Sequence, residues 1–380
     1  MSGTPPGWVV AAGDFVVTGG MDAANHALAA YLARSGREVH LVAHRVAPGL
    51  AALPGVRVHR VPRPLRSHLL GFPLLRRAAR RVAATGPRVT LANGGNFPGR
   101  ATWLHYVHAA YRPHIAGRPL SGAVHRATAA AMRRDERRVV RGARVVIANS
   151  ELTARHAVEL LGADPACVHT VYYGADPARF RPPSAGERSG ARRALGLDAG
   201  VPALVFVGAL GDRRKGFDTL FHAFARLCGE GRGWDATLLV AGAGGELEEW
   251  KRRAGAAGLG ARIRFLGFCP DVRPVLWAAD AVVSPTRYEA YGLAVQEALC
   301  TGLPAVVTRA AGVAERIPAP LDALLPADPD DADELAGRLR AWREGADRYR
   351  DAALDLAAAL SAWTWDQMAA RLAAIVEAKI

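Results

Sequence analysis

Two glutamates eight positions apart, Glu289 and Glu297, are the residues of this chain best suited to hold a polar ligand. Glu289 follows the apolar run 281–284, which predicts a buried strand, and Glu297 lies about one turn inside the next predicted helix. Between them, Gly292 lets backbone approach a ligand closely, and the first amides of the helix favour an anion. Ligands of open α/β sheets bind at this edge. Carboxylates for hydroxyls beside amides for phosphate predict a nucleotide-sugar site.

A basic loop follows another predicted strand, 203–207, and could hold the phosphates of such a ligand. Gly208 ends the strand, and Lys215 is the last residue before a predicted helix over 216–227. Lysine is a compact, rotatable phosphate partner, and only three of the 49 basic residues in the chain are lysine. With Arg213 and Arg214 beside it, the loop suits a diphosphate. The alternative interpretation is a solvated basic turn.

Two segments contain residues that could in principle bind a metal ion. His105 and His108 are three positions apart around the end of a predicted strand, 101–107. Residues at this spacing on a strand point to opposite faces, and we expect no carboxylate or third imidazole nearby. Asp328–Asp330 resembles a D-x-D motif but lies in an acidic tract before a predicted surface helix, which favours a solvated helix start. We therefore expect no metal site.

The segments that would position these residues alternate between strand and helix patterns in both halves of the chain. Predicted strands lie at 8–12, 39–42, 56–61, 89–92, 101–107 and 145–148, and then at 203–207, 236–241, 262–266, 281–284 and 304–307. Such alternation predicts parallel sheets with right-handed crossovers. Gly19 and Gly20 open the first helix without a G-x-G-x-x-G dinucleotide motif. The Pro/Gly/Ser-rich stretch 181–190 predicts a linker between two doubly wound domains.

Composition narrows the class of protein further. The length of 380 residues suits two domains, and no apolar run approaches the span of a membrane helix. The net charge of +14 is spread along the chain without a nucleic-acid-binding motif, so we expect no nucleic-acid partner. The arginine bias is typical of a high-GC bacterial genome. Four widely spaced cysteines predict free thiols in a reducing cytoplasm.

Several motifs, taken in order along the chain, resemble the retaining GT-B glycosyltransferases of family 4. They are Gly19-Gly20, His108, Ser150, Lys215-Gly216 and Glu289-x7-Glu297, and family-like segments extend from Gly19 to Trp365. The resemblance implies an α/β GT-B fold with two Rossmann-like domains facing a central cleft. The acceptor-binding domain would be 1–180, with a last helix at about 363–380 packing back on it. The nucleotide-sugar domain would be 190–362.

The resemblance also assigns roles to individual residues. His108, Lys215 and Glu289 would be catalytic. The donor would be held by Gly19, Gly20, Ser150, Gly208, Arg213, Arg214, Lys215, Gly242, Phe268, Tyr291, Gly292, Leu293 and Glu297. Many family members have an arginine where this chain has Ala209, so Arg213 or Arg214 would have to supply the second cation. The implied reaction is retaining hexosyl transfer from a UDP- or GDP-sugar, without a metal or another cofactor.

The sequence is compatible with two kinds of acceptor, one lipid-linked and one soluble. A basic amphipathic segment, Leu69–Val82, allows peripheral contact with the inner face of a membrane and hence a lipid-linked acceptor. Its apolar side is mostly alanine and leucine without tryptophan, so we prefer a soluble natural-product or oligosaccharide acceptor and a cytoplasmic enzyme. Two alternatives are an epimerase-like enzyme on the same fold and a catalytically weak, nucleotide-sugar-binding partner subunit.

Overall fold

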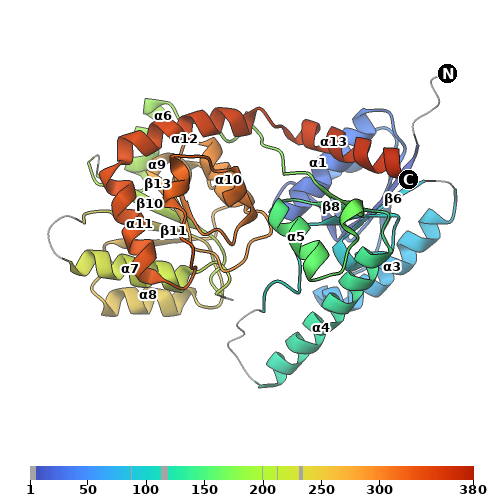
Figure 1. Ribbon diagram of the computed structural model, residues 1–380, viewed down its shortest axis with the longest axis horizontal. Helices are drawn as coiled ribbons and strands as arrows, with labels where there is room; N and C mark the ends of the chain where they lie inside the picture. The colour runs from blue at the N-terminus through green and yellow to red at the C-terminus, as the bar shows by residue number, and fades with distance from the viewer. Residues whose placement is uncertain (1–5, 87, 113–118, 199, 212, 231–233) are drawn as a thin grey trace. The chain divides into compact units, whose positions relative to one another are not determined.

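The computed structural model describes residues 6–86, 88–112, 119–198, 200–211, 213–230 and 234–380. They form two compact units, one from 6–112, 119–174 and 364–380 and the other from 175–363 (Figure 1). Each unit has its own parallel sheet, of seven and five strands, flanked by helices. This confirms the predicted α/β class with two doubly wound sheets. None of the described helices is long and apolar enough to cross a membrane.

In the sheet of the first unit, the order in which successive strands are added reverses at β1. Its strands are β1 (Trp8–Ala11), β3 (Val39–Ala43), β5 (Val56–Arg60), β6 (Val89–Asn93), β7 (Ala101–Leu104), β8 (Val145–Ala148) and β9 (Val168–Thr170). They lie in the order β5-β3-β1-β6-β7-β8-β9, so β1 pairs with β3 on one side and β6 on the other. A separate pair joins β2 (Asp14–Phe15) to β4 (Arg45–Val46). The short strands β2, β4 and β9 were not predicted.

Helices cover this sheet. They are α1 (Gly20–Arg34), α2 (Pro48–Ala51), α3 (His68–Ala83), α4 (Pro119–Gly142), α5 (Glu151–Glu159) and α13 (Trp365–Lys379), with 3₁₀ turns η1 (Pro64–Arg66), η2 (Gly94–Asn96) and η3 (Pro165–Cys167). On α3, Leu75 and Ala79 are buried against the sheet, as the alanine- and leucine-rich side predicts. Arg76, one of the arginines of the basic segment Leu69–Val82, is not free for a membrane surface, because it pairs with Asp135 of α4 at 2.7 Å.

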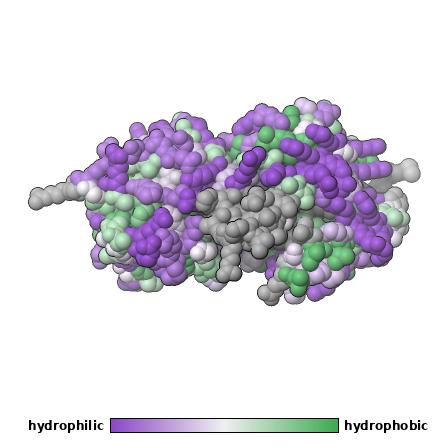
Figure 2. Space-filling model, turned by 90° about the horizontal axis from the view of Figure 1, so that it is seen from below, coloured by the Kyte–Doolittle hydropathy of each residue, from purple (hydrophilic) through white to green (hydrophobic). Residues whose placement is uncertain are grey.

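The second unit has the same kind of sheet. Its strands are β10 (Ala203–Val207), β11 (Thr237–Ala241), β12 (Ile263–Gly267), β13 (Ala281–Ser284) and β14 (Ala305–Val307), in the order β12-β11-β10-β13-β14. Its helices are α6 (Ala185–Ala194), α7 (Phe217–Gly229), α8 (Leu247–Ala256), α9 (Arg273–Ala278), α10 (Leu293–Cys300), α11 (Ala332–Glu344) and α12 (Ala346–Ser361), with η4 (Gly312–Arg316) and η5 (Leu321–Leu324). The surface seen in Figure 2 is mainly hydrophilic.

The stretch expected to be a linker contains α6 instead. Ser184 caps this helix by accepting a hydrogen bond from the Glu187 amide, and the Glu187 carboxylate accepts one from the Ser184 amide. This reciprocal capping box satisfies two helix-end amides. Arg188 then fixes the helix to the unit through Asp280, at 2.6 Å. The Pro/Gly/Ser composition therefore marks the start of a helix and not a flexible connection.

The last helix, α13, packs against α1 in the first unit (Figure 1). The Glu377 carboxylate accepts hydrogen bonds from Trp8 Nε1 at 2.9 Å and from Arg37 Nε at 2.7 Å. Burial alone would raise the pKa of Glu377, but the Arg37 and Trp8 hydrogen bonds lower it below the usual value. The ionised carboxylate therefore holds the end of the chain against β1.

We predict that Glu377→Ala destabilises the first unit by about 1–3 kcal/mol, the usual range for charge-assisted hydrogen bonds in a half-buried setting. Thermal unfolding followed by circular dichroism measures the change. Asp366→Ala on the same helix is the control, because its pair with Arg34 is more than half exposed on both sides and should contribute little. Equal destabilisation by both variants would contradict the role given to Glu377.

Candidate functional site

The site lies where the chain reverses direction across the sheet of the second unit. β10 pairs with β11 on one side and β13 on the other. The loops that leave β10 and β13 therefore lie side by side at the carboxyl edge of the sheet, which is where ligands bind in such folds. The first loop leads into α7 and the second into α10. These are the loops in which the sequence placed Lys215 and Glu289.

Gly216 allows the two loops to touch. It caps α7 with a left-handed backbone, φ 69°, and a Cβ atom there would lie 1.7 Å from the carbonyl oxygen of Pro285. Only glycine fits both demands. Across the same contact, the Arg214 carbonyl accepts hydrogen bonds from the Thr286 hydroxyl and the Arg287 amide, each at 2.8 Å. The basic loop is thus fixed to the loop that carries Glu289.

Glu289 is the centre of a three-residue charge cluster. Its Oε2 accepts a hydrogen bond from Arg214 Nη1 at 2.7 Å and another from Lys215 Nζ. All three side chains are about one-fifth exposed. Burial would raise the pKa of Glu289, but the charges of Lys215 and Arg214 prevail and lower it. Two cations around one carboxylate leave an excess positive charge, which is suited to an anion.

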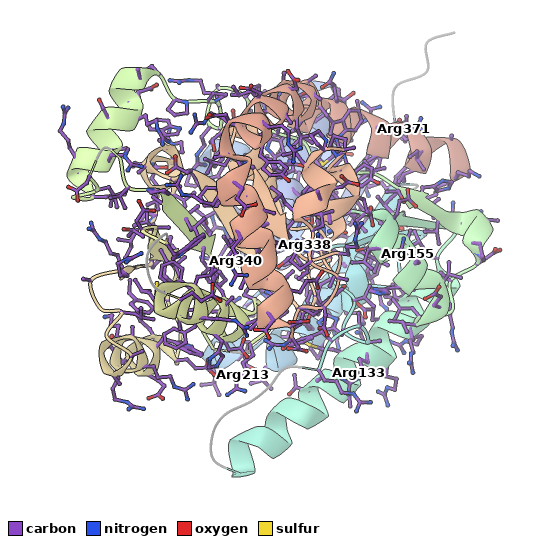
Figure 3. All side chains as sticks on the ribbon, turned by 60° about the vertical axis from the view of Figure 1, so that its left-hand side comes forward. Arg133, Arg155, Arg213, Arg338, Arg340 and Arg371 are labelled. Atoms are coloured by element: carbon purple, nitrogen blue, oxygen red, sulfur yellow. The ribbon has the colours of Figure 1, made fainter. Side chains whose placement is uncertain are left out.

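Arg214 is the cation that the sequence left undecided. It lies beside Lys215 at the cluster, whereas Arg213 is exposed, has a left-handed φ of 54° and lines a small hollow at the start of α7 (Figure 3). The arrangement therefore favours Arg214 over Arg213 as the partner of Lys215.

Arg287 braces the Glu289 loop from the other side. Its guanidinium donates to both carboxylate oxygens of Asp218 on α7, at 2.8 and 2.9 Å, and also pairs with Asp330. Burial would lower the pKa of Arg287, but the two carboxylates raise it well above its ordinary value. Asp330, the second aspartate of the D-x-D-like segment, is thus paired with an arginine. The described residues contain no group of three side chains that could hold a metal ion.

Glu297 lies in a different environment. It is half-buried on α10, and its carboxylate receives no hydrogen bond from the described residues. Burial raises the pKa of Glu297 to about 7, Arg179 opposes the shift and Asp176 adds to it. A carboxylate in this setting gains from a ligand hydroxyl. The Tyr291 side chain is buried and donates to Gln296, so a contribution of Tyr291 to ligand binding would come from its backbone.

Glycines directly follow the neighbouring strands β10 and β11, where the backbones approach closely. Gly242 follows β11, and a Cβ there would lie 1.8 Å from the carbonyl oxygen of Gly208, which follows β10. Beyond the next strand, β12, Phe268 is 76% exposed. A large aromatic ring exposed at the carboxyl edge is available to stack on a planar ligand. Gly292 caps α10 with φ 109° and places Leu293 at the first helical position.

Of the site residues predicted in the first unit, His108 pairs with a carboxylate and the others lie at the starts of helices. The backbone amide of His108 donates to Glu136 Oε2, and its Nδ1 lies 3.0 Å from Glu136 Oε1. Ser150 is fully buried and caps α5, accepting from the Thr153 amide at 3.0 Å. Gly19 caps α1 with φ 87°, and Gly20 is its first residue.

Two sequence-based inferences about the histidines were wrong. β7 ends at Leu104, so the alternation of a strand does not apply, and His105 and His108 line the same cavity. A carboxylate, that of Glu136, does contact His108. It comes from α4, 28 residues further along the chain, so no local spacing could have revealed it. Asn93, followed directly by two glycines at the end of β6, was also missed, although that pattern marks a strand-to-loop junction at the ligand edge.

Comparison with known proteins gives the family. Residues 18–179 match the family model Glycosyltransferase Family 4, and residues 201–343 match Glycosyl transferases group 1. The chain belongs to the family 4 glycosyltransferases. The resemblance drawn from Gly19-Gly20, Lys215-Gly216 and the glutamate pair is thereby confirmed.

Individual relatives share about a third or less of their residues with this chain over the matched regions. D-inositol 3-phosphate glycosyltransferase 1 of Catenulispora acidiphila is 34% identical over 199 residues, 50% of this chain and 47% of that protein. The chain thus spans about half the length of the curated relatives it matches. WaaG, a glycosyltransferase involved in lipopolysaccharide biosynthesis, superimposes with a TM-score of 0.76 at 18% identity, over 97% of this chain and 99% of that one. HepE of Anabaena, solved with UDP-glucose, gives 0.72 at 20%, over 98% and 100%. These likenesses show the GT-B fold.

Glu297 yields a prediction about pH. Its pKa of about 7 in the folded chain exceeds the ordinary 4.5, so the stability it contributes is present below about pH 4.5 and is lost as the pH rises through about 7. The difference corresponds to at most about 3 kcal/mol. Glu297→Gln cannot ionise, so the melting temperature of the variant relative to wild type should be higher at pH 8 than at pH 5.

Thermal unfolding at the two pH values tests this, with Glu344→Gln as the control because Glu344 is exposed on α11. A melting-temperature difference for Glu297→Gln that does not change with pH would contradict a buried, ionising carboxyl at this position.

Proposed function

We propose that the chain is a retaining, nucleotide-sugar-dependent glycosyltransferase whose second unit binds the donor. The observation that carries the proposal is the Arg214–Lys215–Glu289 cluster at the reversal point of a parallel sheet. It combines an anion-binding charge with a carboxylate acceptor for hydroxyls, within the reach of one small ligand. The family membership of the chain supports the same assignment.

In this proposal the diphosphate lies against Lys215 and Arg214 and the first amides of α10. Those amides have no carbonyl partner within their own helix, and the helix dipole favours an anion there. Glu289 accepts hydrogen bonds from the sugar hydroxyls. As the bond to the sugar breaks, negative charge grows on the departing phosphate, and Lys215 stabilises it.

The nucleoside end of the donor would extend along the carboxyl edge of the sheet. Glu297 accepts from the ribose hydroxyls, and Gly208 and Gly242 let the ligand approach the strand ends, with Phe268 near the base. We expect a UDP- or GDP-sugar. The UDP-glucose complex of HepE, which shares the fold, supports the uridine choice.

Retention would follow from substitution on one face of the sugar. The bond between the anomeric carbon and the phosphate oxygen breaks, a bond from the acceptor oxygen forms on the same face, and the acceptor proton passes to the leaving phosphate. No protein nucleophile is required. His108, oriented by Glu136 in the first unit, would present its Nε2 to the reacting sugar. We expect a soluble acceptor in the cytoplasm.

Lys215→Ala should lower turnover by about 10²-fold or more, the scale of removing a preorganised oxyanion donor. Release of nucleoside diphosphate from UDP-glucose and GDP-mannose, with transfer of sugar to an acceptor, is the measurement. Lys215→Arg should also be impaired, because a planar fork does not replace a compact ammonium.

Lys251→Ala is the matched control, since Lys251 pairs with Glu248 on an exposed helix face and should leave turnover unchanged. Near-wild-type turnover in Lys215→Ala would exclude the phosphate role. Binding of the nucleotide-sugar without any transfer would favour a partner subunit, and a rearranged free sugar nucleotide would favour an epimerase.

Activity should survive EDTA. The leaving-group charge is met by Lys215, Arg214 and helix amides, so the proposed chemistry needs no divalent ion. Initial rates with and without EDTA, measured under single-turnover conditions to exclude effects on product release, test the point. A strict requirement for added Mg²⁺ or Mn²⁺ in that experiment would refute the metal-independent assignment.

A further inference from the structure

The cavity of the first unit that His105 and His108 line has a volume of about 350 Å³. It lies at the carboxyl ends of β6 and β7, close to the point where the sheet reverses at β1. Its floor is formed by Asn93 and His105, and its walls include Met21 of α1, Phe72 and Pro73 of α3 and Met132 of α4. The volume is at the lower end for small-molecule sites, which suits a ligand of one or two rings.

Both floor residues are more than nine-tenths buried, and each has a polar atom that finds no partner among the described residues. These atoms are Asn93 Nδ2 and His105 Nε2. An unpaired buried polar group costs free energy, so the pair points to a ligand that supplies the missing bonds. Asn93 Nδ2 is a donor by its chemistry. The character of His105 Nε2 depends on the tautomer.

A chain of hydrogen bonds favours one tautomer. Thr153 donates to Asn149 Oδ1 at 2.8 Å, and Asn149 Nδ2 donates to the Tyr173 hydroxyl at 3.2 Å. The Tyr173 hydroxyl lies 2.5 Å from His105 Nδ1 and can donate its own proton to that nitrogen. Burial lowers the pKa of His105 to about 3, so the ring is neutral, and an Nδ1 that accepts from Tyr173 leaves the ring proton on Nε2. The floor thus presents two donors.

The charges around the cavity disfavour an anionic ligand. Among the described lining residues, the single arginine, Arg76, is already paired with Asp135, and a second carboxylate, Glu136, is held by His108. Arginines of α4, among them the half-buried Arg133 (Figure 3) and the exposed Arg134, line a separate surface hollow. A phosphate in the cavity would meet two carboxylates and only one engaged cation.

We propose that this cavity binds the acceptor, and that the acceptor is an uncharged molecule with an apolar body of one or two rings. A hydroxyl, ether or carbonyl oxygen of that molecule accepts hydrogen bonds from Asn93 and His105, while the methionine, phenylalanine and proline walls enclose its rings. That this ligand is a sugar acceptor rests on the proposed function, whereas its chemical class rests on the cavity alone. An uncharged acceptor would separate this chain from relatives that are named for a phosphorylated inositol.

Equilibrium binding of 2-naphthol, followed by its fluorescence at pH 7 without any donor, tests the inference on the intact chain. 2-Naphthyl phosphate is the matched probe, since it carries the same rings with a charged group. We expect 2-naphthol to bind at least tenfold more tightly than 2-naphthyl phosphate. Equal or tighter binding of the phosphate would overturn the uncharged class.

Variants locate the binding. Met132→Trp fills the cavity and should abolish 2-naphthol binding, whereas Arg134→Trp, which adds the same ring to an exposed position of α4, should not. Asn93→Leu should weaken binding several-fold. If Met132→Trp, with an unchanged circular dichroism spectrum, still binds 2-naphthol like wild type, the cavity is not the site and the inference fails.

The assay also separates this inference from the proposed function. 2-Naphthol binding without any sugar transfer to any acceptor would refute the transferase and leave the cavity ligand class standing. Sugar transfer to phosphorylated acceptors, with 2-naphthol unbound, would support the transferase and overturn the inference.

Discussion

The half-buried carboxylate of Glu289 is the constraint around which the second unit is organised. A charge removed from water needs partners, because desolvation costs several kcal/mol per ion. Arg214 and Lys215 provide them only if the loops after β10 and β13 touch, and the loops touch only because position 216 is glycine. Arg287 secures the same contact through Asp218 of α7. The cluster is therefore built before any ligand arrives, so little would need to reorganise when a phosphate is met.

The two sheets use one topological device for different chemistry. In each, the order of strands reverses beside a central strand, and the diverging loops open a space at the carboxyl edge. In the second unit this edge carries glycine-backed strand ends and excess positive charge. In the first, it carries an apolar cavity with two neutral donors and paired charges. The contrast suits a polyanionic donor on one unit and an uncharged acceptor on the other, which is the division of labour that we propose.

Local sequence patterns predicted what local forces decide. The strands 203–207 and 281–284 were placed at their observed bounds, because buried parallel strands leave continuous apolar runs flanked by glycine or a polar loop. The contact of His108 with Glu136 could not be predicted, since it depends on how α4 packs across the sheet. The helix α6 was missed for a different reason: the composition of 181–190 suggested a linker, although Ser184 and Glu187 already had the spacing of a capping box.

Ala209, the departure from the family pattern, illustrates how structure can compensate for sequence. A cation directly after Gly208 would act from the start of the loop. Here Arg214 reaches Glu289 from the end of the same loop, next to Lys215, because Gly216 closes that end against Pro285. Two positive charges thus lie at one carboxylate without an arginine at position 209, and in the proposed site both would face the phosphate. Arg214 donates to the Tyr288 carbonyl as well as to Glu289, so two contacts from one loop fix the position of this cation in the protein without a ligand.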